Sequence, residues 1–205
     1  MKPTLSLILA RCKANDGIGF KGSLPWSISQ DMKFFQKKTK KVDSCHENLP
    51  NYQNAVIMGR ITWESIPEKF KPLHDRFNII LSKTTKEPTK IELNGLFYHM
   101  CGDIDQAFNI IENNSISITF VIGGNSIYNQ VLTNYANRVR NIYLTDIVSN
   151  HSYNVDTHFI YPLPNKQFEL TENESVHNQL DKLNNVRVDL EFSCFTNIHF
   201  VNEQN

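Results

Sequence analysis

A carboxylate, Asp31, stands among apolar residues in a segment with the period of a helix. Ile28, Met32 and Phe35 fall within about 60° of one another at 100° per residue, which predicts an apolar stripe facing the interior, with Asp31 beside it. A half-buried carboxylate needs a donor, and the two parallel N–H groups of a 2-aminopyrimidine would suit it. Alternatively, the acid only favours the positive end of the helix dipole. The helix by itself leaves both interpretations open.

The start of this helix has a signal of its own. Ser27 and Gln30 are spaced as a capping box, so the helix is predicted to begin at Ile28. The side opposite the stripe carries several lysines, and the run between positions 37 and 41 is the one strong local basic cluster of the sequence. Such a run is usually a solvated helix face, which we favour over a nucleic-acid site.

Two further features could bind anions. Gly123 and Gly124 separate an apolar run from a helical segment starting near Asn125, so the backbone could approach a pyrophosphate at a helix N-terminus. The pair is not a GxGxxG fingerprint, so it does not predict a Rossmann fold. Arg76 precedes an apolar run, where a lone arginine is usually a surface residue.

Composition excludes several classes of protein. The chain has 205 residues, 40% of them hydrophobic, and 21 basic residues balance 21 acidic ones, so no overall field attracts nucleic acid or anionic lipid. The four cysteines are scattered, which argues against a zinc site and a disulfide framework, and Cys45-His46 fits a surface loop better than a metal site. No apolar stretch approaches membrane-spanning length. The first residues lack a signal-peptide cleavage site, so we expect a cytoplasmic protein.

The chemistry-bearing residues must be positioned by an α/β fold. Short apolar runs predict buried strands, and helical segments alternate with them. The last third predicts an antiparallel hairpin of Gln167–Val176 and Val186–Thr196. We expect one domain over residues 1–205, with ligands at the carboxyl ends of the strands. The predicted buried strands are Leu5–Ala10, Ala55–Met58, Phe77–Leu81, Phe120–Ile122 and Ile142–Leu144, and the predicted helices are Asp103–Asn113 and Ser126–Leu132.

Four blocks of sequence resemble the dihydrofolate reductase family. They occur in the order and spacing of that family and cover nearly the whole chain, and four in register are hard to obtain by chance. The blocks are Gly17–Trp26 followed by Asp31 and Phe34-Phe35, Val56–Pro67 leading into Arg76, Val121–Tyr128, and Asp156–Phe159.

The resemblance implies a single-domain α/β fold with a central, mixed but mostly parallel eight-stranded sheet, flanking helices and an antiparallel C-terminal hairpin. It implies NADPH-dependent reduction of 7,8-dihydrofolate to tetrahydrofolate, by hydride transfer to pterin C6 and protonation at N5, and inhibition by antifolates. Asp31 would hold N3 and the 2-amino group, and Trp26 would anchor an active-site water; these two are the expected catalytic residues. The alternative for Trp26 is a core aromatic. No metal is implied.

The resemblance also implies a set of substrate-binding residues. Arg76 would grip the α-carboxylate of the substrate's glutamate tail, and backbone carbonyls near Ile8 and at Ile122 would face a ring amino group. The full set is Ile8, Leu9, Ala10, Asp31, Met32, Phe35, Thr62, Ile66, Leu73, Arg76, Ile122, Tyr128 and Thr145.

The expected cofactor-binding residues include a cation pair for the 2′-phosphate, Arg60 and Lys83, together with Ser82. Members of the family hold the Gly123–Gly124 bond in the cis form. One departure, Met100–Gly102 where many relatives have an arginine, would weaken the preference for NADPH. The loop Asn15–Trp26 would act as a lid. The full set is Ala10, Ile18, Gly22, Ser23, Leu24, Gly59, Arg60, Ile61, Thr62, Leu81, Ser82, Lys83, Ile122, Gly123, Gly124, Asn125, Ser126, Ile127 and Tyr128.

Three alternatives remain at this stage. A reductase of the same fold acting on a riboflavin-pathway intermediate would share the cofactor site, but Asp31, Arg76 and the Leu24–Trp26 segment argue against it. A binding module without catalysis is disfavoured by the intact Asp31, Trp26 and glycine pair. The chain could also be the reductase portion of a fusion with thymidylate synthase. We expect a monomer that binds neither membrane nor nucleic acid.

Overall fold

The computed structural model describes residues 3–200. Its strands are β1 (Leu5–Cys12), β2 (Gly17–Gly19), β3 (Gln53–Gly59), β4 (Arg76–Leu81), β5 (Thr89–Leu93), β6 (Leu96–Cys101), β7 (Ile116–Val121), β8 (Val139–Val148), β9 (Thr157–His158), β10 (Phe168–Asp181) and β11 (Val186–Asn197). They form one sheet of order β10-β11-β8-β1-β7-β3-β4-β6-β5, and β2 and β9 extend from β1. Pairing is parallel from β8 to β6 and antiparallel at both ends.

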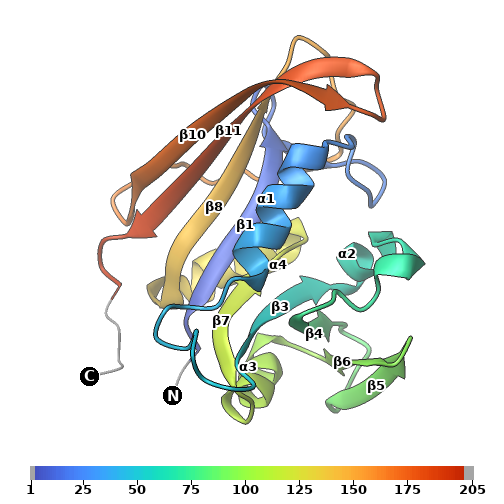
Figure 1. Cartoon of the computed structure of the whole chain (residues 1–205), viewed down its shortest axis with the longest axis vertical. Coiled ribbons are helices and arrows are strands. Elements are labelled where there is room, and N and C mark those ends of the chain that lie inside the picture. The colour runs from blue at the N-terminus through green and yellow to red at the C-terminus, as the bar shows by residue number, and fades with distance from the viewer. Residues whose placement is uncertain (1–2, 201–205) are drawn as a thin grey trace.

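Four helices flank the sheet: α1 (Ser29–Lys40), α2 (Arg60–Ser65), α3 (Ile104–Glu112) and α4 (Asn125–Asn134). Helix α1 crosses one face, and α3 and α4 lie on the other (Figure 1). Short 3-10 turns span Glu68–Phe70 and Ala136–Arg138.

Each central strand is buried on both faces, as the continuous apolar runs predict. Leu7 and Ile57 belong to the cluster that includes α3 and α4 residues, whereas their neighbours Ile8 and Met58 belong to the cluster that α1 covers. Side chains alternate between faces along a strand, so one apolar run supplies both layers.

The predicted fold class is confirmed, and every predicted strand and helix overlaps an observed one. The sheet has eleven strands rather than eight. The additional strands β2, β5 and β9 lack the apolar runs on which the prediction depends. Strand β5 is largely exposed, and β2 and β9 have only three and two residues. The turn from β5 into β6 is made by Asn94 and Gly95, both of which have a positive φ.

Strand β10 forms one edge of the sheet and pairs only with β11 along the main strand order. Most of its 14 residues are exposed. Its register with β11 shifts between Leu170 and Glu172 and again between Val176 and Gln179. Its last residue, Asp181, is fully buried and lies near the start of α1.

Candidate active site

Asp31 lies in the first turn of α1, and only 7% of it is exposed. Burial raises the pKa of its carboxyl from 3.8 to about 6, and a hydrogen bond from the hydroxyl of Thr145 acts in the opposite direction. Thr145 is buried on β8 and pairs in register with Ala10 of β1. The helix therefore holds a buried carboxylate beside two parallel strands, as the first of the two interpretations requires.

The start of α1 differs from the predicted capping box. The N-cap residue is Ile28, and no side chain caps the helix. The backbone N–H of Ser27 donates instead to the carboxylate of Asp181, at 2.9 Å. The capping-box prediction is wrong because the helix begins one residue later than predicted, and the N–H of Ser27, which Gln30 would have bonded, is taken by Asp181.

The predicted apolar stripe is only partly correct. Ile28 is buried and Phe35 is half-buried, but Met32 is 42% exposed. The buried residues of α1 are Asp31 and Thr39, so the carboxylate belongs to the interior face of the helix.

Trp26 is buried, with 3% exposed, in the cluster that closes the hairpin end of the sheet. Its ring meets Tyr153 edge-on, with 5.6 Å between centroids. Its Nε1 is buried and has no partner among the described residues. A buried donor without a partner favours an ordered water there, and this agrees with the water-anchoring role better than with a purely packing one.

Tyr128 links α4 to β1. Its hydroxyl donates a buried hydrogen bond of 2.8 Å to the carbonyl of Ile8, and burial raises its pKa. That carbonyl keeps a second lone pair for a ligand amino group. Leu9 is buried beside it, and the N–H of Ile122, one residue past β7, donates to the carbonyl of Ile57.

Arg76 is buried, not a surface residue, with 8% exposed. Its Nε donates to the carbonyl of His74 at 2.9 Å, and its Nη1 donates to Oγ1 of Thr39 at 3.0 Å. Burial lowers its pKa to about 10, with Asp75 opposing, so the guanidinium stays charged at neutral pH. The Phe35 ring lies 5.8 Å from the guanidinium carbon.

Apolar side chains connect Arg76 to the strand ends. Phe35, Ile66 and Leu73 are partly buried and pack against one cluster of the sheet. The buried members of that cluster are Ile8, Val56, Met58, Ile80 and Phe120. The structure therefore brings three of the four expected pocket walls together, whereas the fourth, Met32, is 42% exposed and is not part of this cluster.

The glycine pair joins β7 to α4 through a cis peptide bond, as expected from the resemblance. Gly123 has a φ of +125°, and a Cβ there would come within 3.3 Å of Oγ1 of Thr62 and 3.4 Å of Oη of Tyr128. Its carbonyl accepts a 2.7 Å hydrogen bond from the N–H of Gly59. Residues expected at the cofactor thus meet around a point where only glycine fits.

The cations expected at the 2′-phosphate lie just after neighbouring parallel strands. Arg60 follows β3, Ser82 and Lys83 follow β4, and the last residues of those strands, Gly59 and Leu81, pair in register. Arg60 is half-exposed and forms a 2.6 Å ion pair with Glu64. Lys83 is exposed and Ser82 is buried.

The glycine-rich loop after β2 approaches α2. A Cβ on Gly22, whose φ is +78°, would lie 3.4 Å from Ile61. Ile18 packs against the core, whereas Leu24 is 47% exposed. The N–H of Ser23 bonds back to the carbonyl of Phe20 and closes a tight turn.

Two acids near this site had no role in the sequence-based set. The Asp156 carboxylate accepts a 2.8 Å bond from the N–H of Lys21, and its own N–H donates to the carbonyl of Gly19. The block Asp156–Phe159 contained that signal. Asp181 had no signal, because its contacts depend on the hairpin.

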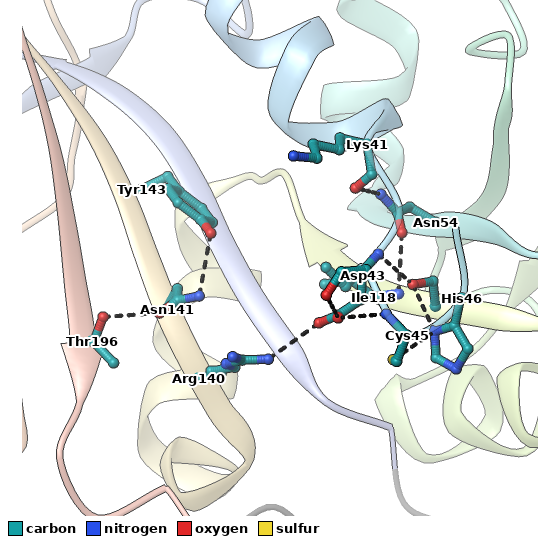
Figure 2. Close-up of polar contacts among 12 residues, drawn as sticks. Lys41, Asp43, Cys45, His46, Asn54, Ile118, Arg140, Asn141, Tyr143 and Thr196 are labelled. Carbon is teal, nitrogen blue, oxygen red and sulfur yellow. Dashed lines mark hydrogen bonds and ion pairs between the residues drawn. The ribbon is translucent and has the colours of Figure 1, made fainter. Parts of the chain in front are cut away.

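The Cys45-His46 pair lies in the loop after α1 (Figure 2). Cys45 is exposed, and Nδ1 of His46 contacts the hydroxyl of Ser117 at 3.0 Å. Asp43 of the same loop accepts from Arg140 of β8. These contacts fasten a surface loop, as predicted, and residues 3–200 contain no cluster of side chains suited to a metal. No helix in that part of the chain is long and apolar enough to span a membrane.

Comparison with known proteins agrees with this geometry. A family model described as dihydrofolate reductase matches residues 4–193. The dihydrofolate reductase of Candida albicans is 37% identical over 164 residues, which are 79% of each chain. That of Heliothis virescens is 38% identical over 173 residues, covering 84% of this chain and 86% of the relative, and that of Schistosoma mansoni is 38% identical over 156 residues, covering 74% and 76%. The chain therefore belongs to the dihydrofolate reductase family.

Proposed function

We propose that this chain reduces 7,8-dihydrofolate to 5,6,7,8-tetrahydrofolate with NADPH, at a site centred on Asp31. Membership of the family makes it an NADP-dependent oxidoreductase. The observation that carries the proposal for the site is the buried Asp31 carboxyl, with a pKa of about 6, next to Thr145.

Asp31 has the chemistry to hold a pterin and to help protonate it. Its two oxygens can accept the parallel N–H groups of the aminopyrimidine edge, and the Thr145 hydroxyl orients them. A pKa near neutrality lets the group gain and lose a proton at working pH. The Nε1 of Trp26 can hold a water molecule. Asp31 would polarise this water, which would carry the proton to N5.

The residues around Gly123 fit NADPH. The backbone there is free of side chains at the start of α4, the Oδ1 of Asn125 is buried with no partner among residues 3–200, and Arg60 and Lys83 supply positive charge beyond β3 and β4. When bound, NADPH supplies the hydride that adds to pterin C6. Helix N-termini and paired cations both favour phosphate groups.

Arg76 is suited to the carboxylate at the other end of the substrate. Its Nε and one Nη are already fixed by His74 and Thr39, so the guanidinium is pre-oriented. The remaining N–H groups can grip a planar carboxylate, a geometry that a lysine does not reproduce.

The test is the decay of NADPH absorbance by the purified protein with and without 7,8-dihydrofolate. We expect consumption only with dihydrofolate, blocked by a methotrexate-like diaminopteridine. Consumption with a riboflavin-pathway intermediate instead, or binding of both ligands without turnover, would overturn the proposal.

We also propose that residues 1–205 act as one cytoplasmic domain that works as a monomer. A single continuous sheet from Leu5 to Asn197 supports the one domain, and four free cysteines fit a reducing compartment. Light scattering and imaging of a tagged chain test both points. A stable dimer or secretion would contradict them.

A further inference from the structure

Asp181, at the end of β10, is fully buried and accepts four hydrogen bonds. Its Oδ1 accepts from the N–H of Ser27 at 2.9 Å and of Leu183 at 3.0 Å. Its Oδ2 accepts from Nδ2 of Asn184 at 2.7 Å and from the hydroxyl of Tyr153 at 2.9 Å. All four donors are uncharged, so the carboxylate is stabilised by hydrogen bonds and not by an ion pair.

The same end of the hairpin holds the chain on both sides of Trp26. Nδ2 of Asn184 also donates to the carbonyl of Pro25 at 2.9 Å, before the tryptophan. After it, the N–H of Lys182 donates to the carbonyl of Ser27 at 2.9 Å. Asp181 and Ile28 further form an isolated antiparallel bridge.

These contacts matter because α1 has no side-chain cap at its start. The direction of its first turn is therefore set by what holds the residues just before it. Asp31 lies only three residues beyond Ile28, and the ring of Trp26 packs on Tyr153, which itself donates to Asp181. A shift of the segment 25–28 would move both expected catalytic residues together.

We propose that Asp181 is a positioning residue: through its carboxylate, the hairpin β10–β11 fixes Trp26 and the first turn of α1, and thereby the place of Asp31. The proposal rests on the reductase function above. Misplacement by about 1 Å can cost about a hundredfold in rate, so a residue far from the substrate can control the chemical step.

Burial acts to raise the pKa of Asp181. The hydrogen bonds outweigh this effect and hold the pKa below its usual value, and the bond from Asn184 is the largest of them. The group is therefore ionised at neutral pH. Asp181→Asn removes this charge and puts an NH2 group in place of one of the two oxygens, where it faces either the N–H of Ser27 or the amide of Asn184, so one of these two links should break.

Asp189→Asn is the matched control, since Asp189 lies on the same hairpin. Its carboxylate accepts from the N–H of Asn178 at 2.8 Å and pairs with His177, and neither contact reaches the segment 25–28. We expect Asp181→Asn to lower kcat for dihydrofolate about 10–100-fold, to shift the pH profile of kcat/KM, and to leave the KM for NADPH within about twofold, on the order of 0.4 kcal/mol. Asp189→Asn should match the wild type in all three.

Asn184→Ala keeps the other three donors on Asp181 and removes the bonds of Asn184 to Asp181 and to the carbonyl of Pro25, so it serves if Asp181→Asn does not fold. It should show the same changes in weaker form. If every folded variant keeps the wild-type kcat and pH profile while the wild type reduces dihydrofolate, Asp181 has no positioning role. A wild type that does not reduce dihydrofolate overturns the proposed function instead, before any variant is compared.

Discussion

The hydroxyl of Thr145 on β8 donates a hydrogen bond to the carboxylate of Asp31 on α1, and both side chains are buried. The pair joins a helix to a strand that lies more than a hundred residues away in the chain. We expect Asp31→Asn to lower kcat about 10²–10⁴-fold at pH 7, because the site loses its ionisable group. Steady-state rates with saturating NADPH measure this.

The pH profile adds a second expectation for the same residue. Burial holds the pKa of Asp31 at about 6, so kcat/KM of the wild type should fall as pH rises above that value, since the protonated site supplies the proton. Asp31→Glu keeps a carboxyl and should keep this fall. If Asp31→Asn showed the same pH profile of kcat/KM as the wild type, Asp31 would have no role in the protonation step.

Asp31 should also cost stability at neutral pH. Its folded-state pKa of about 6 exceeds the ordinary 3.8, so its contribution to stability is fully present below 3.8 and is lost as pH rises through about 6. The loss is about 3 kcal/mol at most. In urea unfolding, the free energy of unfolding of Asp31→Asn relative to that of the wild type should increase between pH 4 and pH 7. An unchanged difference across that window would contradict the burial of the charge.

Arg76→Lys should weaken dihydrofolate binding about 10–100-fold, because a charge-assisted, bidentate contact is lost. The affinity for NADPH should not change. Arg140→Lys is the control, since Arg140 pairs with Asp43 on the surface (Figure 2). Fluorescence titration gives both dissociation constants. An unaltered dihydrofolate constant in Arg76→Lys would rule out the proposed role at the glutamate tail.

Lys83→Ala should narrow the gap between NADPH and NADH about tenfold, worth about 1.4 kcal/mol. The exposed ammonium would no longer meet the 2′-phosphate, which NADH lacks. Arg60→Ala should act similarly, although its ion pair with Glu64 reduces its availability. The ratio of kcat/KM values measures the gap, and Lys90→Ala on β5 controls for loss of positive charge alone. Equal ratios in all variants would place the phosphate elsewhere.

Gly123→Ala should raise the dissociation constant for NADPH about tenfold or more, on the order of 1.4 kcal/mol. The new Cβ would press on Thr62 and Tyr128, and a φ of +125° suits only glycine. Gly95→Ala is the comparison, because Gly95 also has a positive φ but has nothing within 4 Å of an added Cβ. It should destabilise the fold modestly without changing cofactor affinity. If Gly95→Ala raised the dissociation constant for NADPH as much as Gly123→Ala does, backbone strain and not crowding of the site would be responsible.

The sequence predicts the central strands well, because β1, β3 and β4 are apolar on both faces and interrupted by helical segments. It misses β5, whose residues Thr89–Leu93 are mostly exposed and polar, since pairing with β6 and not burial makes it a strand.

The candidate site divides in the same way. Asp31 and the glycine pair stand in recognisable local patterns, whereas the local pattern around Arg76 predicts a surface residue and only the resemblance to the family identifies it. The acid that holds Ser27 is 154 residues away from it, and only the fold of the hairpin brings them together. The stripe of Ile28, Met32 and Phe35 is only partly right for a related reason: the helical period predicts a face, but the packing of α1 on the sheet decides which residues near that face are buried, and Met32 is 42% exposed.

The outer edge of β10 has a consequence for handling the protein. Its unpaired backbone could template a strand from another molecule, and two register shifts together with Glu169, Glu172 and Glu174 oppose that. Replacing these glutamates with glutamine should therefore remove the electrostatic barrier and favour aggregation through this strand, while the parallel centre of the sheet stays intact.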